Sequence, residues 1–400
     1  MMNINTKPRV QKYGRLPLTP AAFNVNVYDT NENPDYLTRQ IITYIGNKRS
    51  LLGFIAKGIK IVQERLNKNK LDIFDVFTGS GIVARLFKQF SSLLIVNDLE
   101  KYAAVTGECY LSNKDELNIP LLKDIYYSLL DEIKTKPLTE GITAKLYSPK
   151  DDNNIQKDER VFYTRGNAMY IDTMRGLIDT VPVQYQKYFI SPLIAEASIH
   201  ANTSGVFKGF HKNRQTGIGQ FGGSNNDALL RIKGGIELPF PVFSNFNCRY
   251  MVYNGDSNAV IQEVPEVDLA YIDPPYNQHP YGSNYFMLNL ILENIQPLNV
   301  SRISGIPGNW NRSAYNKRRH AYKALSALIA GIKAKFVLVS FNSEGFISLP
   351  EMKTMLEKNG KVQILETAYN TFRGCRNLSS LAENGERDIY VTEYLYLLEK

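Results

Sequence analysis

Short apolar runs alternate with longer amphipathic segments along most of this chain. Between residues 40 and 105 the pattern predicts helix, strand, helix, strand and helix in turn. From about residue 245 onward, runs with the length and apolar content of strands recur at 248–253, 267–272, 336–341, 362–367 and 389–398. Because strands and helices alternate, we expect an α/β protein with a doubly wound sheet.

The middle of the chain breaks this alternation. Residues 115–136 and 171–203 carry helical patterns, whereas 145–159 is polar and typical of a loop. We therefore expect a mainly helical insert within the α/β fold. The predicted organisation is a basic N-terminal arm at 1–39, a core in two parts at 40–105 and 245–400, and the insert at 106–244.

The composition is that of a folded protein with ample apolar material. The 400 residues are 44% hydrophobic, which suggests two or three domains and differs from the profile of a disordered chain. No apolar run reaches the length of a membrane span, and the basic N-terminal residues precede no apolar signal segment. We expect a cytoplasmic protein that does not enter a membrane.

Cysteine and histidine are too scattered to suggest a site. Cys109, Cys248 and Cys375 have neither the spacing of a metal knuckle nor that of a disulfide framework, and the four histidines form no ligand-spaced cluster. We expect no structural metal.

Positive charge is concentrated in a few segments. The net charge is +8, yet no Asp or Glu occurs between Asn294 and Ser343, where cations and aromatic residues are interleaved. Such a stretch suits the phosphates of a nucleic acid, although a solvated basic face would have the same pattern. The candidates for DNA contact in it are Lys317, Arg318 and Arg319.

A second basic region lies within the insert. Residues 205–214 combine cations with aromatic residues, and a glycine-rich polar stretch follows through Gly223. This frame suits contact with base edges, and a mobile solvent loop is the alternative. The candidates for DNA contact here are Lys208, Lys212 and Arg214. The first 28 residues hold four cations and no acid, which predicts an arm on the phosphate backbone or a disordered tail.

A rigid acidic turn follows the apolar run 267–272. Its residues are Asp273, Pro274, Pro275 and Tyr276, and the two prolines set the direction in which the chain leaves the strand. A nucleobase amino group is a poor nucleophile because its lone pair is delocalised into the ring. Asp273 and the Pro274 carbonyl can accept hydrogen bonds from its two protons, while Tyr276 can stack on a base outside the duplex. An ordinary turn is the alternative for these four residues taken alone.

A glycine turn follows the strand expected near residues 71–76. Gly79 and Gly81 allow a sharp bend and close approach of a ligand, although Gly-x-Gly also occurs in plain strand-to-helix turns. Asp98 ends the next apolar run at the place of a ribose acceptor. Upstream, residues 44–49 place an aromatic residue and cations before a helix, which suits a ligand carboxylate.

Taken in order, these segments resemble the Dam-like (D12 class, alpha group) adenine-specific DNA methyltransferases, which are often found in restriction-modification systems. That family is similar to this chain in placing Tyr/Trp-x-Gly-x-Lys first, then Phe-x-Gly-x-Gly, a target-recognition insert and Asp-Pro-Pro-Tyr. The resemblance runs from about Tyr44 to the end of the chain. Thr78 departs from the commoner Ala, and the long separation of the two turns implies a larger insert.

The resemblance implies a fold, an activity and partners. The fold would be that of the Rossmann-like S-adenosylmethionine-dependent methyltransferases, with 106–244 as the target-recognition domain and the last two strands as an edge hairpin. The activity would be methyl transfer to the 6-amino group of adenine in double-stranded DNA, with no metal. The partners would be duplex DNA and a cognate restriction endonuclease that acts separately.

The resemblance also assigns residues to the cofactor. It implies that S-adenosylmethionine is surrounded by Tyr44, Gly46, Lys48, Asp75, Phe77, Gly79 and Gly81. Asp98 would accept hydrogen bonds from its ribose hydroxyls. Asp256 would bind the amine of its adenine, and a helix N-cap or turn carboxylate is the equal alternative for this residue.

Rival functions remain at this point. Methylation of the 4-amino group of cytosine uses the same geometry, but that class more often has Ser at the first position, so Asp273 favours adenine. Enzymes that methylate RNA or a protein glutamine tend to have Asn there. A non-catalytic DNA-binding scaffold of the same fold is the third alternative, and the intact glycine turn and acid argue against it.

Overall fold

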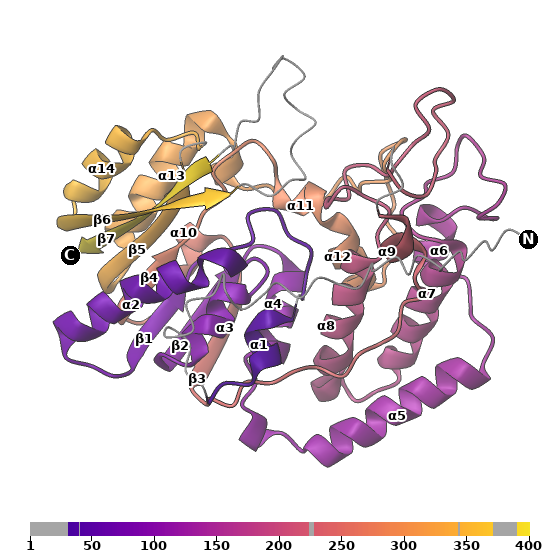
Figure 1. Cartoon of the computed structure of the whole chain (residues 1–400), viewed down its shortest axis with the longest axis horizontal. Coiled ribbons are helices and arrows are strands. Elements are labelled where there is room, and N and C mark those ends of the chain that lie inside the picture. The colour runs from indigo at the N-terminus through magenta and orange to yellow at the C-terminus, as the bar shows by residue number, and fades with distance from the viewer. Residues whose placement is uncertain (1–30, 40, 224–227, 343–344, 371–389) are drawn as a thin grey trace, which may run out of the picture.

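The computed structural model describes residues 31–39, 41–223, 228–342, 345–370 and 390–400. These residues contain a seven-stranded sheet in the order β3-β2-β1-β4-β5-β7-β6 (Figure 1). The strands are β1 Leu71–Asp75, β2 Ser91–Asp98, β3 Arg249–Asn254, β4 Val267–Ile272, β5 Ala334–Asn342, β6 Lys361–Asn370 and β7 Tyr390–Glu399. Strands β1 to β5 pair in parallel, and β7 pairs antiparallel with both β5 and β6. The predicted doubly wound fold and the edge hairpin strands are confirmed.

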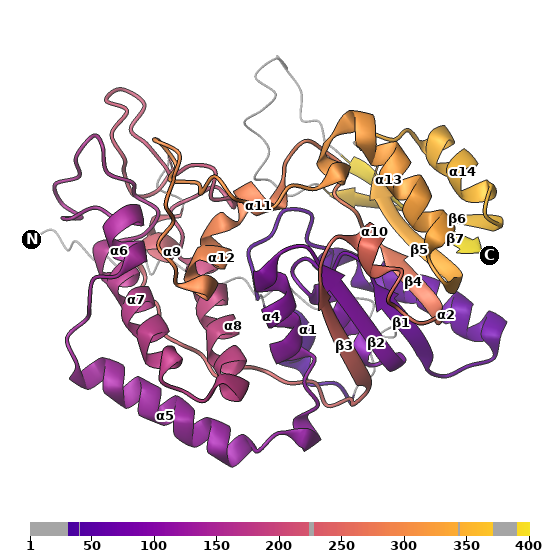
Figure 2. The same ribbon diagram turned by 180° about the vertical axis from the view of Figure 1, so that it is seen from behind.

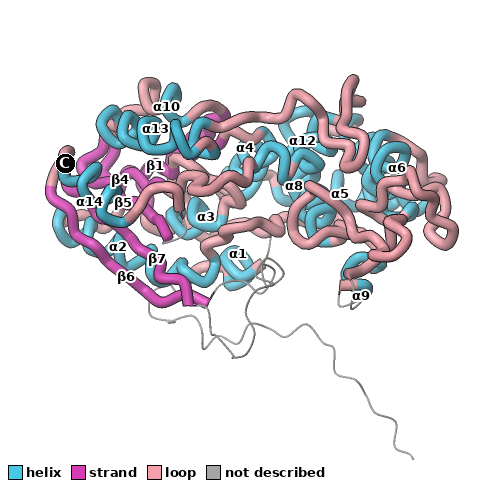
Figure 3. The backbone as a smooth tube through the Cα atoms, turned by 90° about the horizontal axis from the view of Figure 1, so that it is seen from above, coloured by secondary structure: helices cyan, strands magenta, loops and turns pink. Residues whose placement is uncertain are grey.

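Helices cover both faces of this sheet, which explains why its central strand is buried throughout. Every residue of β4 is buried, and Leu269 and Tyr271 contribute to one core while Ala270 and Ile272 contribute to the other. The first core includes α2 Leu52–Leu66, α3 Ile82–Lys88 and α4 Lys101–Tyr110, and the second includes α10 Ser257–Val260, α13 Arg318–Gly331 and α14 Leu349–Glu357. Figure 3 shows α10 and α13 on one side of the strands and α2 and α3 on the other.

The strand order creates a switch point between β1 and β4. After β1 the chain builds β2 and β3 on one side, and it then returns to place β4 on the opposite side of β1. Loops that leave the carboxyl ends of β1 and β4 therefore diverge, and ligands of open α/β sheets bind in the crevice between such loops. The two turns are held side by side, because the Val76 amide donates to the Tyr271 carbonyl at 3.0 Å.

The insert is mainly helical, as predicted. Its helices are α5 Ile119–Thr135, α6 Ile142–Tyr147, α7 Arg165–Asp179, α8 Val183–Ile199 and α9 Leu229–Lys233, and they stand beside the sheet in Figure 2. The expected helix at 171–203 is wrong as a single element, because α7 ends at Asp179 and α8 begins after Pro182. A proline disfavours helical backbone in the residue before it, so the chain turns there.

The elements do not divide at the expected domain limits. Helix α4 runs through residue 106, and α12 Phe286–Glu293 packs against α4, α7 and α8 although it follows the acidic turn at 273–276 in sequence. The short elements α11 Tyr281–Asn284, η3 Arg49–Leu51, η4 Lys114–Glu116 and η5 Ala314–Asn316 complete the order. The domain limits themselves stay a prediction.

The end of the expected N-terminal arm belongs to the core. Tyr36 of helix α1 Pro34–Thr38 is completely buried, and the Tyr36 hydroxyl donates to the Tyr110 carbonyl at 2.6 Å. The described residues 31–39 of the expected arm therefore include a helix that packs into the core, and 1–30 lie outside the described residues. Among the helices that the structure describes, none is both long and apolar enough to span a membrane.

Candidate active site

A pocket lies at the carboxyl ends of β1, β2 and β4, where the switch point predicts one. Its empty space is about 930 Å³ including the open mouth, which is the size of a small-molecule site. Among the residues predicted from sequence, those that line it are Tyr44, Gly46, Lys48, Phe77, Gly79, Asp98, Asp256, Asp273, Pro274, Pro275 and Tyr276. Segments more than two hundred residues apart in sequence therefore meet in one cavity.

The glycine turn wraps around the carboxylate of Asp98. Gly79 has φ +54°, and a Cβ on it would lie 3.0 Å from a carbon of the Tyr44 ring, so glycine is needed for both backbone and space. The Gly79 amide donates to Asp98 Oδ2 at 2.7 Å, and the Glu100 amide donates to Oδ1 at 2.9 Å. Burial raises the pKa of Asp98 to about 6, against the effect of these amides.

Glu100 is a second acid of the pocket that the sequence reasoning missed. It is buried, and its Oε2 accepts from Asn289 at 2.7 Å and from Asn311 at 3.2 Å. Burial, reinforced by the charge of Asp98, raises the pKa of Glu100 to about 7. The available signal was its position two residues after Asp98 at the end of a strand.

The acidic turn at 273–276 carries a buried network of charges. Lys48 Nζ lies 3.3 Å from Asp273 Oδ1 and 2.7 Å from Glu393 Oε1, and the three side chains are 5%, 18% and 3% exposed. Burial raises the pKa of Asp273 to about 6, although Lys48 acts to lower it. Burial lowers the pKa of Lys48, but the two carboxylates outweigh it and leave that pKa above its usual value. Lys48 is therefore a permanent ammonium.

This network changes the interpretation of Lys48. The sequence reasoning placed it beside a ligand carboxylate, whereas its ammonium is engaged by Asp273 and Glu393 of the protein itself. The sequence reasoning missed Glu393, which lies 345 positions from Lys48 and belongs to no motif.

Tyrosine rings form one wall of the pocket. Tyr44 stacks on Tyr281 with centroids 4.9 Å apart and on Tyr285 with centroids 4.6 Å apart. The Ile45 amide donates to the Tyr285 hydroxyl at 2.7 Å, while the Tyr281 hydroxyl donates to the Ile45 carbonyl at 3.3 Å. Neither Tyr281 nor Tyr285 was among the site residues predicted from sequence, although a four-residue spacing is that of neighbours on one helical face.

Three predicted cofactor residues have structural roles of their own. Gly81, with φ +76°, is the N-cap of α3 and does not line the pocket. Asp256 lines the pocket and is also the N-cap of α10, where it accepts from the Asn258 amide at 3.0 Å. Asp75 is fully buried at the end of β1 with no side-chain hydrogen-bond partner among the described residues, and the Phe77 amide is the polar group that acts to lower its pKa. Burial and the charge of Asp273 raise the pKa of Asp75 well above its usual value.

Tyr276 contacts residues of β5 and of the segment that follows β5. Its ring meets Phe341 edge to face with centroids 5.9 Å apart, and its carbonyl accepts from the Phe346 amide at 2.9 Å. Lys48 Nζ lies 5.9 Å from its ring centroid. The turn is therefore fixed against β5 and the loop that follows it.

The predicted DNA contacts all lie outside the pocket. Their six side chains are exposed: Lys208, Lys212, Arg214, Lys317, Arg318 and Arg319. The last three begin α13, whereas the first three lie in the loop before α9.

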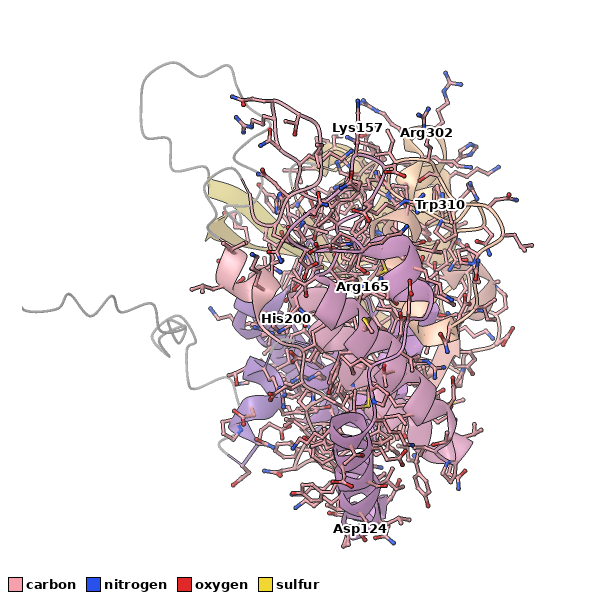
Figure 4. All side chains as sticks on the ribbon, turned by 90° about the vertical axis from the view of Figure 1, so that its right-hand side faces the viewer. Asp124, Lys157, Arg165, His200, Arg302 and Trp310 are labelled. Carbon is pink, nitrogen blue, oxygen red and sulfur yellow. The ribbon has the colours of Figure 1, made fainter. Side chains whose placement is uncertain are left out.

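The acid-free segment that follows α12 is tied to the insert. The Tyr147 hydroxyl donates to the Gly305 carbonyl at 2.7 Å, and Ser304 donates to the Lys208 carbonyl at 2.5 Å. Arg160 donates to the carbonyls of residues 301 and 302, both at 3.3 Å. Figure 4 shows Arg302 and Trp310 along the same edge as Lys157 of the insert. Residues 301–305 of the acid-free segment therefore adjoin the second basic region at Lys208.

Within the described ranges, no three His, Cys, Asp or Glu side chains are grouped as metal ligands would be. Cys109 and Cys248 are buried free thiols, and Cys375 lies outside the described residues.

Comparison with known proteins identifies related sequences over most of the chain. The family model described as D12 class N6 adenine-specific DNA methyltransferase matches residues 44–226 and 240–355. Type II methyltransferase M.NlaIII of Neisseria lactamica is 27% identical over 368 residues, which cover 90% of this chain and 99% of that protein. Type II methyltransferase M.CviAII of Paramecium bursaria Chlorella virus 1 is 26% identical over 366 residues, which cover 89% and 98%. Modification methylase StsI of Streptococcus sanguinis is 26% identical over 365 residues, which cover 87% of this chain and 51% of that longer protein.

Proposed function

Because the chain belongs to the D12 class N6 adenine-specific DNA methyltransferases, we propose that it methylates an adenine rotated out of duplex DNA, with S-adenosylmethionine as the donor. The observation that carries the proposal is one pocket that contains both the glycine turn with Asp98 and the acidic turn with Asp273. The family model that matches describes the adenine-specific class, so the 4-amino group of cytosine is not the proposed target.

The β1 and β2 side of the pocket suits the donor. Asp98 is a partly buried acceptor at the end of β2, where an acid can accept hydrogen bonds from ribose hydroxyls, and Glu100 lies two residues further on. Asp75 ends β1 directly before the glycine turn and does not line the pocket, so in this proposal it supports that turn. When bound, S-adenosylmethionine supplies a methyl group on a cationic sulfur. Asp256, in this proposal, combines its N-cap role with a contact to the donor's adenine.

The β4 side of the pocket suits the target amine. Lys48 engages Oδ1 of Asp273, which leaves Oδ2 to accept a hydrogen bond from the adenine amino group. The Pro274 carbonyl is the second acceptor, and it lines the same cavity. Together the two acceptors hold the amino protons so that the nitrogen lone pair is directed at the methyl carbon.

The transfer conserves atoms and charge. The nitrogen forms a bond to the methyl carbon, the electrons of the breaking carbon–sulfur bond stay on sulfur, and the nitrogen then loses one proton. Asp273, as a carboxylate, is an acceptor in place for that proton. The protein thus contributes orientation and electrostatic complementarity, because the donor is already activated by its charge. Tyr276 holds the base by stacking.

The DNA duplex lies, in this proposal, across the edge that the two basic regions share. The insert side brings Lys208, Lys212 and Arg214, and the start of α13 brings the cations at 317–319. Cations of this kind position the duplex through its phosphates, whereas base identity is read in the grooves. We assign that reading to the insert.

The chain is proposed to act as the modification enzyme beside a separate restriction endonuclease. Its relatives are named type II methyltransferases and modification methylases, which supports this role.

The deciding experiment is expression in a host without DNA methylation, followed by single-molecule sequencing of the genome. We expect 6-methyladenine in one short motif and its disappearance with Asp273→Ala. An unmodified genome in cells that contain the folded protein contradicts the proposal. Retention of donor binding in the Asp273→Ala variant is the control for folding.

A further inference from the structure

Glu393 of β7 is a buried acid outside every motif of the site. Its Oε1 accepts from Lys48 Nζ at 2.7 Å and from the Ser340 hydroxyl at 2.9 Å, and its side chain is 3% exposed. Burying a carboxylate and an ammonium costs several kcal/mol per ion unless they are paired and hydrogen bonded. The buried Glu393 carboxylate is therefore stabilised by specific hydrogen bonds, which Lys48 and Ser340 donate to its Oε1.

The sheet explains how an acid of the last strand reaches the catalytic turn. Leu395 and Leu397 of β7 and Leu338 of β5 belong to the core on the α2 side of the sheet. Side chains two positions apart on a strand share a face, so the side chains of Glu393 and Ser340 lie on the same face of the sheet as these leucines. Lys48 stands on the same side, just before η3 and α2.

Lys48 is shared unequally between its two acids. The ammonium lies 0.6 Å closer to Glu393, at 2.7 Å, than to Asp273, at 3.3 Å. An ammonium bound to Asp273 alone would lie closer to it and would weaken Oδ1 and Oδ2 as hydrogen-bond acceptors. Sharing leaves Asp273 a stronger acceptor while its position stays fixed.

We propose that Glu393 is a positioning residue for methyl transfer, which acts through Lys48 to keep Asp273 oriented and fully able to accept from the target amine. This inference rests on the proposed role of Asp273. Two electrostatic effects support it: Lys48 lowers the pKa of Asp273, and Glu393 raises it.

The test is the single-turnover rate of methyl transfer by Glu393→Gln across pH, at saturating S-adenosylmethionine and DNA. The amide keeps the shape of Glu393 but removes its charge, so Lys48 is drawn to Asp273 and the pKa of Asp273 falls. We expect at least a tenfold lower plateau rate. We also expect a shift of the acid limb to lower pH, with the dissociation constants of donor and DNA within about twofold of the parent.

Glu366→Gln is the matched control. Glu366 is an exposed acid of β6, the strand next to β7. The parent rate and acid limb are expected in this variant. A similar shift there would mean that any loss of charge near this edge has the same effect, which would overturn the proposal.

Two results with Glu393→Gln would also overturn it. One is a plateau rate and an acid limb of the pH profile that both equal those of the parent protein. The other is a lower plateau rate with the acid limb at the same pH, which the loss of a merely structural residue would produce. Should this variant not fold, Glu393→Asp decides, because it keeps the charge but withdraws it by one methylene. A lower plateau with a limb shifted to lower pH supports the proposal, and an unmoved limb refutes it. A parent protein without any methyl transfer would instead refute the proposed function.

Discussion

The rate of methyl transfer is expected to depend on a carboxylate whose pKa is far above that of a free aspartic acid. Asp273 must be ionised to accept a hydrogen bond from the adenine amine, and burial raises its pKa to about 6. Activity is therefore lost as pH falls through about 6. With one such group, the rate at pH 5 is about one tenth of the plateau, and at pH 7.5 it is within about 5% of it.

The assay must separate this group from the other acids of the pocket. The pKa of Asp98 is raised to about 6 and that of Glu100 to about 7, so donor binding also weakens as pH falls. The single-turnover rate, measured with the donor well above its dissociation constant at each pH, removes that contribution. Asp98→Asn is the matched control, because it alters donor affinity but leaves the acid limb of the rate in place.

One result would refute this reasoning. If the single-turnover rate stays at its plateau down to pH 5, Asp273 either keeps an ordinary pKa or is not required as a carboxylate. In the first case Lys48, which acts to lower the pKa of Asp273, offsets the effect of burial more fully than the distances in the network imply. In the second case Asp273→Asn would retain activity, and this variant distinguishes the two.

Three further perturbations test other parts of the site. Gly79→Ala should weaken donor binding by about tenfold, because alanine is strained at φ +54° and its Cβ would press on the Tyr44 ring. Equilibrium binding of S-adenosylmethionine measures this change. A variant that binds the donor as tightly as the parent protein would contradict the close approach of the donor to the Gly79 backbone. Asp98→Asn should raise the donor dissociation constant about 10- to 100-fold, as removal of a charge-assisted acceptor does; an unchanged constant in calorimetry would rule out its ribose role. Replacing the three cations at 317–319 by glutamine should lower the slope of log affinity for DNA against log salt concentration by about one unit for each phosphate that is no longer neutralised. The methylated motif should not change. If the slope equals that of the parent protein, these three residues do not contact DNA.

Much of the site was predictable because its parts are local in sequence. A strand that ends in Asp-Pro-Pro-Tyr, and another that ends in a glycine turn, can be recognised from apolar runs and turn chemistry alone. The order of the segments then supported the family, and the pocket brings 11 of the 13 predicted catalytic and cofactor residues together. Gly81 and Asp75 fall outside the lining because one caps a helix and the other lies beneath the turn.

Backbone propensity and side-chain period act over a few residues, and they are enough to define the strands, the two turns and their acids. The partners of those acids are set only when the complete chain is packed. Lys48 and Glu393 meet across 345 positions only because β7 inserts between β5 and β6 with Glu393 on the α2 side. Strand order and facing depend on packing of the whole sheet, which no local pattern encodes. The charge state of Asp273 depends in turn on those distant partners and on its burial.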